Sequence, residues 1–282
     1  MKTPEPKKGC PKCKGLGMLV GVRDGLASGT ICDCVVVDGA AEGAWCPRCS
    51  DTARIELDGR WLRCKCRLLP DRIALYDRAH IPARHGTSTF MAWNMRLEGS
   101  AMESSRIQSW CQAFEPGIKG FVLWGAVGRG KTHLMCAALR EIVFAKGARV
   151  RFVEFTHLLQ DLRRGFDSGR GTTALIDEVM DCEVLAIDEL GKGRNTEWEL
   201  AVLDELVSGA YNGMKTLVAT SNYRPAGVTG LGPGNLAMVG SGKQETQTLG
   251  DRVGERAWSR LNEMTKSMPI GDQRVDFRLA PE

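Results

Sequence analysis

One short segment of the sequence combines the residue types that bind phosphate groups. Residues 125–132 read GAVGRGKT and fit the pattern GxxxxGK[ST], with an apolar strand predicted before them at 121–124 and a helix after them at 132–144. Glycines let backbone N–H groups turn toward phosphate oxygens, and the first turn of the helix adds a favourable partial charge. The pattern predicts a nucleotide site in which Lys131 contacts the β- and γ-phosphates and Thr132 binds Mg²⁺. The residues expected to contact ATP are Gly125, Gly128, Arg129, Gly130, Lys131, Thr132 and His133.

Polar residues also follow two apolar stretches further along the chain. Asp188 and Glu189 end the stretch VLAIDE, which predicts Asp188 as a second Mg²⁺ ligand and Glu189 as the general base for an attacking water. Asn222 ends the stretch LVATSN. Ligands of parallel sheets lie beyond the carboxyl ends of the strands, so we expect Asn222 near the γ-phosphate or the water. Such residues also cap helices or begin turns, and only the phosphate-binding segment upstream favours the catalytic interpretation.

A parallel sheet is needed to bring these side chains together. From residue 120 on, apolar strand-like segments alternate with helical ones, which predicts an α/β fold whose parallel sheet is covered by helices. The expected strands are 121–124, 149–155, 183–187 and 216–220, and the expected helices are 132–144, 156–164, 196–211 and 252–264. Residues 226–250 are rich in glycine and predict a mobile loop.

Eight of the eleven cysteines lie before residue 67, in an internal repeat. Each copy joins a CxxC pair to a CxC pair, and four thiolates with such spacing are typical of a tetrahedral Zn²⁺ site. An exchange of ligands between the copies is also possible. Asp58-Gly59 predicts a hairpin turn between strands at 53–57 and 60–63, so this part of the chain is expected to be β-rich. The two sets of predicted zinc ligands are Cys10, Cys13, Cys32 and Cys34, and Cys46, Cys49, Cys64 and Cys66.

The composition of the 282 residues is that of a folded protein with about two domains. It is 43% hydrophobic, yet no apolar run approaches the roughly 20 residues that span a bilayer. The start of the chain lacks a leader pattern, and paired cysteines without one favour metal binding in a reducing cytoplasm. We predict a zinc-binding module at 1–69, a linker with approach helices at 70–115 and a nucleotide-binding domain at 116–282.

Residues 120–282 resemble the AAA+ ATPases of the DnaC/DnaI helicase-loader and IstB transposition-helper group. The resemblance rests on GAVGRGKTHL, VLAIDELG, TLVATSN and, most specifically, GERAWSRLNEM. It implies an AAA+ P-loop domain that hydrolyses ATP as an oligomer. Carried over by position, it makes Arg260 an arginine finger that reaches the neighbouring subunit's site, and Asn222 the first sensor. The second sensor falls on Arg278, with Arg274 as the alternative.

The resemblance also implies a task in the initiation of DNA replication. It suggests loading of a DnaB-type replicative helicase onto single-stranded DNA, with residues 1–69 contacting the helicase, in the cytoplasm of a bacterium or a phage-infected cell. The alternative is an IstB-like helper that acts on duplex DNA with a transposase. Two other hypotheses are an adaptor whose ATP site is a static switch, and a zinc-dependent nucleic-acid-binding module. For the latter, Trp61 among Arg60, Arg63, Lys65 and Arg67 either stacks on a base or is packed within the module.

Overall fold

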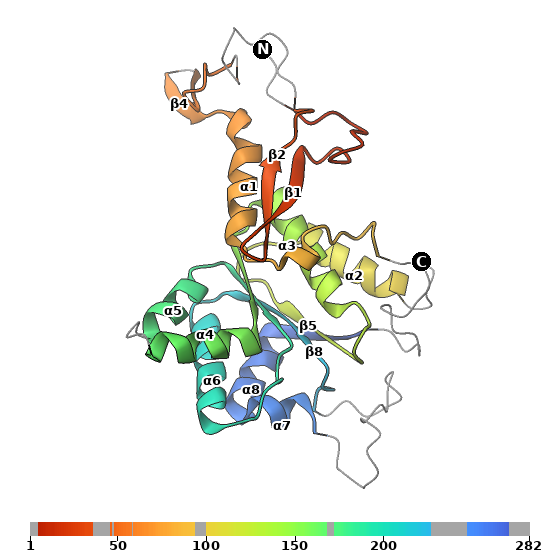
Figure 1. Cartoon of the computed structure of the whole chain (residues 1–282), viewed down its shortest axis with the longest axis vertical. Coiled ribbons are helices and arrows are strands. Elements are labelled where there is room, and N and C mark those ends of the chain that lie inside the picture. Colours follow the sequence, from red (N-terminus) through yellow and green to blue (C-terminus); the bar gives the residue numbers. More distant parts are fainter. Residues whose placement is uncertain are drawn as a thin grey trace. The chain divides into compact units, whose positions relative to one another are not determined.

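The structure is a computed structural model that describes residues 5–35, 46, 48–57, 59–93, 100–167, 172–226 and 247–270. The chain divides after Thr87 into two compact units, which we call the N-terminal and the C-terminal unit (Figure 1). The predicted domain boundaries after residues 69 and 115 stay predictions. Among the described helices, none is both long and apolar enough to cross a membrane.

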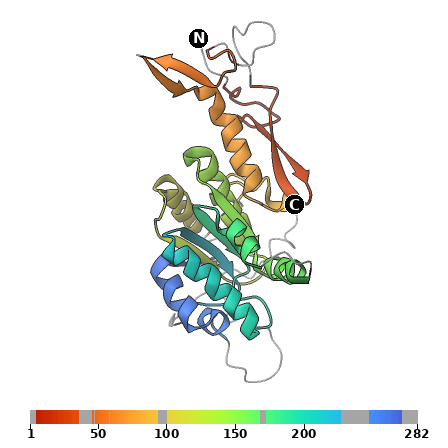
Figure 2. The same cartoon turned by 90° about the vertical axis from the view of Figure 1, so that its left-hand side faces the viewer.

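Two antiparallel hairpins and one long helix make up most of the N-terminal unit. In the first hairpin Met18 faces Ile31, and Gly29 donates its N–H to Asp77 Oδ1 of the helix at 2.7 Å. Figure 2 shows this hairpin beside the helix, whereas the second hairpin projects beyond the helix's first turn. The elements are β1 (Met18–Arg23), β2 (Leu26–Ile31), β3 (Arg54–Leu57), β4 (Arg60–Arg63), α1 (Leu68–Arg78), and 3-10 turns at Lys65–Arg67 and Ala83–His85.

A five-stranded parallel sheet forms the centre of the C-terminal unit, with the strand order β6-β7-β8-β5-β9. This confirms the predicted α/β class. The described elements are α2 (Ser100–Gln112), β5 (Gly120–Trp124), α3 (Lys131–Lys146), β6 (Val150–Glu154), α4 (Phe155–Asp167), α5 (Thr172–Met180), β7 (Val184–Asp188), α6 (Glu197–Asn212), β8 (Thr216–Ser221), α7 (Leu249–Val253), α8 (Glu255–Met264) and β9 (Thr265–Pro269).

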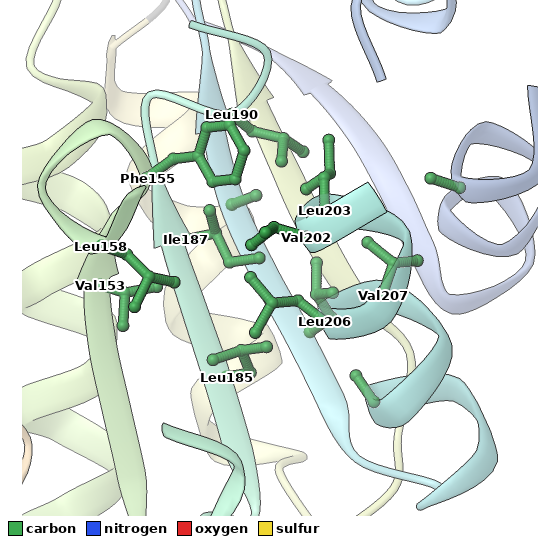
Figure 3. Close-up of a cluster of buried hydrophobic side chains, with 14 of the residues drawn as sticks. Val153, Phe155, Leu158, Leu185, Ile187, Leu190, Val202, Leu203, Leu206 and Val207 are labelled. Atoms are coloured by element: carbon green, nitrogen blue, oxygen red, sulfur yellow. The ribbon is translucent and has the colours of Figure 1, made fainter. Parts of the chain in front are cut away.

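Helices cover both faces of this sheet, with α2 and α3 on one side and α6 and α8 on the other (Figure 1). On the second side, Leu185 and Ile187 of β7 meet Val202 and Leu206 of α6 (Figure 3). All four side chains are buried. This packing holds β7 rigidly, and it therefore also fixes the position of the polar residues at the carboxyl end of the strand.

Three parts of the C-terminal unit differ from the prediction. The helix α5 was not among the expected elements, although Ile176 and Val179 are buried on it. The helix expected at 252–264 is divided, because Gly254 has φ +82°, a conformation that ends α7 before α8 begins. The strand β9 was not predicted, because its residues TKSMP lack an apolar alternation and β5 pairs with it through the backbone. Most of the Gly-rich stretch, 227–246, lies outside the described residues, as do Arg274 and Arg278.

Candidate nucleotide and zinc sites

The loop that joins β5 to α3 requires glycine at several positions. Gly125, Gly128 and Gly130 have φ values of +148°, +79° and +73°, which residues with a side chain rarely adopt. A Cβ on Gly130 would lie 2.4 Å from the Trp93 ring, so no larger residue fits there. Because α3 begins directly at Lys131, its first N–H groups lie beside the loop. This geometry matches an anion-binding cradle.

Lys131 is hydrogen-bonded through its ammonium to backbone oxygens of this loop. Its buried ammonium donates hydrogen bonds to the backbone oxygens of Gly125 at 2.8 Å and Ala126 at 2.7 Å. An ammonium held at the mouth of a glycine-rich loop is well placed to bind phosphate oxygens. Binding of a phosphate by Lys131 would therefore exchange these carbonyl partners for charged ones.

The Asp188 carboxylate is the centre of a hydroxyl cluster at the carboxyl ends of β7 and β8. Its Oδ1 accepts hydrogen bonds from Thr132 Oγ1 at 2.9 Å and Thr220 Oγ1 at 2.5 Å. Burial raises the pKa of Asp188 above its ordinary value, although both hydrogen bonds act in the opposite direction. A buried carboxylate beside a threonine hydroxyl is a donor set suited to Mg²⁺, and a cation there would offset the desolvation of the carboxylate.

Glu189 has a strained backbone that its neighbours hold in place. Its φ is +56°, and its N–H donates to Thr220 Oγ1 at 3.0 Å. Its carboxylate forms an ion pair with Lys192, three residues on, and this pairing raises the Lys192 pKa. Glu189 would have to leave Lys192, or share its charge with it, in order to accept a proton from water.

Thr220 is a site residue that the sequence analysis missed. It links Glu189 to Asp188 through one hydroxyl, which accepts from the former and donates to the latter. It lies within the stretch TLVATSN, but its contacts with β7 depend on the pairing of the two strands, which the sequence does not state. Asn222 lies just beyond β8 and is exposed, so its predicted role near a phosphate stays a prediction.

The segment ahead of α2 contacts the phosphate loop from outside. His133, which was predicted to contact nucleotide, hydrogen-bonds through Nε2 with the Thr89 backbone oxygen at 3.0 Å and through Nδ1 with Ser88 Oγ at 3.3 Å. The Trp93 ring lies 5.9 Å from the His133 ring, centroid to centroid. In this structure the imidazole therefore anchors the lead-in segment to α3.

Three arginines of α7 and α8 have different surroundings. Arg252 is buried and donates to the backbone oxygens of Gly191 at 2.9 Å and Gly193 at 2.6 Å, just past Glu189. Arg260 pairs with Asp204 of α6 at 3.1 Å and is half-buried, whereas Arg256 is exposed. The sequence analysis did not single out Arg252, since the approach of the 191–193 loop to α7 is visible only in three dimensions.

The eight predicted zinc ligands gather in two clusters, one from each copy of the repeat. In each cluster the four Sγ atoms lie within 4.8 Å of one another. The Cys10–Cys32 and Cys13–Cys34 sulfurs are 3.9 and 3.4 Å apart, and the corresponding pairs of the second cluster are 3.9 and 3.5 Å apart. Tetrahedral Zn²⁺ with bonds of about 2.3 Å places its sulfurs roughly 3.8 Å apart, so both clusters fit this ion. The ligand sets follow the copies without exchange between them.

Comparison with known proteins agrees with the geometry of the nucleotide site. The family model described as AFG1-like ATPase matches residues 80–237, which is more than half of the chain. The chain belongs to the AFG1-like ATPase family. The matched region includes the glycine loop, Asp188 and Thr220, and it begins after both cysteine clusters.

The relatives of this AFG1-like ATPase confirm the resemblance to the helicase-loader group. The replicative helicase loader DnaC of Escherichia coli is 24% identical over 183 residues, which cover 64% of this chain and 67% of the relative. A crystal structure of the DnaC helicase loader aligns with a TM-score of 0.55 and 26% identity, over 67% of this chain and 99% of that one. A putative ATP-binding protein in an insertion sequence of Mycobacterium tuberculosis is 32% identical over 50% of this chain and 53% of its own length.

Proposed function

We propose that this AFG1-like ATPase hydrolyses ATP in order to load a replicative hexameric helicase onto single-stranded DNA. The observation that carries the proposal is the cluster of Thr132, Asp188 and Thr220 beside a glycine cradle, in a chain similar to a helicase loader. The same similarity supports a role in the initiation of replication, in the cytoplasm of a bacterium or a phage-infected cell.

The proposed chemistry assigns separate tasks to these residues. The glycine loop and Lys131 bind the phosphates, and Thr132 with Asp188 holds Mg²⁺, which would neutralise charge on the phosphates when bound. Glu189 orients the water and accepts its proton, after release from Lys192. Asn222 is proposed as the first sensor, and Arg278 or Arg274 as the second. Arg260 is proposed to complete the site of the neighbouring subunit.

The N-terminal unit supplies the proposed contacts with partners. Residues 1–69 would dock on the helicase, and Zn²⁺ at the two cysteine clusters would stabilise this small region. Its clusters contain few apolar side chains besides the cysteines, among them Val35 and Ile55. The loops that carry the cysteines, with so few apolar neighbours, would depend on metal for their structure.

One observation favours a second candidate function. The relative that is 32% identical is named for its place in an insertion sequence. A transposition helper that acts on duplex DNA with a transposase would use the same nucleotide site. The client, and not the ATPase geometry, separates the two proposals.

The decisive experiment captures the client in the ATP-bound state. Glu189→Gln should bind ATP with near-normal affinity and hydrolyse it at least about 100-fold more slowly, because the general base is lost. The variant, held with ATP, would be used as bait in a lysate of the native host, and captured proteins identified by mass spectrometry. Lys131→Ala, which cannot hold the phosphates, is the matched control.

The outcome separates the candidates. A hexameric helicase on the Glu189→Gln bait and not on the Lys131→Ala bait supports the loader. Capture of a transposase by the Glu189→Gln bait would support the transposition-helper function instead. Normal ATP hydrolysis by Glu189→Gln would contradict the role assigned to Glu189.

A further inference from the structure

The two copies of the cysteine repeat are used differently. The β1–β2 hairpin is part of a packed structure, with Met18 and Ala27 buried and Ala27 donating its N–H to the Ile81 backbone oxygen at 2.8 Å. In the β3–β4 hairpin, Ile55 alone is partly buried, against the second cysteine cluster, and the other described side chains of both strands are exposed. The second hairpin therefore projects from the rest of the unit (Figure 2), with the second cysteine cluster at its base and an ion pair from Arg63 to Asp71 of α1.

Trp61 is displayed on this projection and not packed in a core. Its side chain is 66% exposed, although a tryptophan gains more from burial than almost any other residue. An isolated two-stranded hairpin is only marginally stable, and the exposed Trp61 ring adds no buried apolar surface that would stabilise this one. This observation decides between the two interpretations of Trp61 that the sequence left open.

The strand register shows which side chains share a face with the ring. Trp61 lies opposite Glu56, and the next pair on this face is Arg54 opposite Arg63. Like charges directly opposite each other destabilise a strand pair. Arg63 is compensated by an ion pair with Asp71 of α1 at 2.6 Å, whereas Arg54 remains exposed. Arg54 is therefore the cation of this face that stays available to an anion, with the Glu56 carboxylate beside it.

The charge of the second copy is also more positive than that of the first. Residues 46–69 contain six Lys and Arg against three Asp and Glu, and residues 10–35 contain three against two. A four-thiolate zinc site carries two negative charges, so only the second copy keeps a net positive charge once metal is bound. This asymmetry favours an anionic ligand for the second copy.

We propose that the face of β3–β4 formed by Arg54, Trp61 and Arg63 binds single-stranded nucleic acid, with one base stacked on Trp61 and the arginines beside the backbone phosphates. Aromatic side chains with flanking cations bind single strands in this way, without a requirement for sequence. The inference gives a location to the DNA contact of the proposed function and rests on that function for its biological role.

The distribution of apolar side chains favours nucleic acid over a protein partner at this face. Leu57 and Leu62 are exposed too, but the register places them on the opposite face of the hairpin. The neighbours of the ring on its own face are therefore charged side chains, the carboxylate of Glu56 and the guanidinium groups of Arg54 and Arg63. A tryptophan at the centre of a protein interface needs neighbours that exclude water, whereas base stacking needs one open ring face and nearby cations.

Binding of fluorescein-labelled oligothymidylate to the full-length, zinc-loaded chain, followed by fluorescence anisotropy, tests this site. Trp61→Ala should weaken binding roughly 5- to 140-fold, and Trp61→Phe should recover most of the loss. Leu62→Ala changes the next residue of the same strand on the opposite face, and its affinity should stay within about twofold of wild type. Arg54→Gln should make the slope of log K against log salt concentration less negative by about 0.7, because one phosphate contact is lost.

Zinc content and thermal unfolding of each variant show that the fold is intact. Unchanged affinity in Trp61→Ala, or an equal loss in Leu62→Ala, overturns the inference. A Trp61→Ala chain that loses the helicase but keeps DNA also overturns it and leaves the loader function standing. If the wild-type chain captures no helicase but binds DNA through Trp61, the inference about this face is supported. The loader proposal then fails.

Discussion

The ion pair between Arg260 and Asp204 bears on the trans role proposed for this arginine. Both side chains are about one-third exposed, and pairs of this kind contribute roughly 0–1 kcal/mol. Arg260 can therefore leave Asp204 at little cost when a neighbouring subunit presents a phosphate. We expect Arg260→Ala to bind nucleotide normally and to lose turnover by about 1000-fold, measured as steady-state phosphate release.

Mixing experiments test whether the arginine acts between subunits. A mixture of Arg260→Ala with Lys131→Ala should recover part of the activity, because one variant supplies the intact loop and the other the intact arginine. Asp204→Asn is the matched control and should hydrolyse ATP normally. If mixing restores nothing, or if Arg256→Ala alone abolishes turnover, Arg260 does not hold this role.

At the residue scale, the sequence predicted the side chains that lie within continuous motifs. The glycine cradle and Lys131 were predictable because their positions depend on adjacent residues. Thr220 was not, since its hydroxyl bridges two neighbouring strands, and the pairing of Lys192 with Glu189 was missed although the two residues are only three positions apart. Contacts between strands depend on sheet order, which one sequence does not state.

At the scale of elements, Arg252 joins α7 to the loop that follows β7. It donates to two carbonyls of that loop and lies 5.1 Å from the Tyr223 ring centroid. We expect Arg252→Met to lower the free energy of unfolding by about 3 kcal/mol, because both carbonyls lose a charged donor. Turnover should fall as well, since the loop carries Glu189 at its start.

Urea unfolding of the C-terminal unit measures this effect. Arg256→Met, at an exposed position four residues on, should change the free energy of unfolding by less than about 0.5 kcal/mol. Equal effects of the two substitutions would show that Arg252 does not hold the loop.

Most elements with a clear apolar period were predicted, whereas α5 was missed although Ile176 and Val179 are buried at helical spacing. The segments of β5, α3, β7, α6 and β8 match their predicted ranges closely, because buried strands and covering helices need continuous apolar residues. The break between α7 and α8 depends on one glycine with positive φ, and β9 depends on pairing with β5. Neither leaves an apolar pattern in the sequence.

At the scale of the whole molecule, the two units should respond differently to loss of metal. The buried residues around each cysteine cluster are mainly the cysteines themselves, whereas the C-terminal unit has an extended apolar core. Structural zinc contributes on the order of 10–16 kcal/mol to folding of small domains. We expect a chelator to unfold the β3–β4 hairpin, whose described side chains are exposed except for Ile55, while the β1–β2 hairpin keeps its packing on α1 and ATP binding persists.

Amide hydrogen exchange read by mass spectrometry would follow each unit within the intact chain. Protection should disappear from residues 54–63 on chelation and return when zinc is added, whereas residues 18–31 should keep most of theirs. Protection of β5 and β7 should not change. Persistent protection of the β3–β4 hairpin without metal would contradict the assignment of zinc as its stabiliser.

The sheet order also has a consequence for synthesis on the ribosome. β5 is made first among the five strands, yet its neighbours β8 and β9 are the last two. β8 begins roughly 90 residues after β5 ends, which corresponds to about 5–20 s of translation. During that interval the apolar segment GFVLW has neither of its pairing partners. The nascent chain is therefore expected to need a chaperone until its final strand has emerged, and translation speed beyond β5 should affect the yield of folded protein.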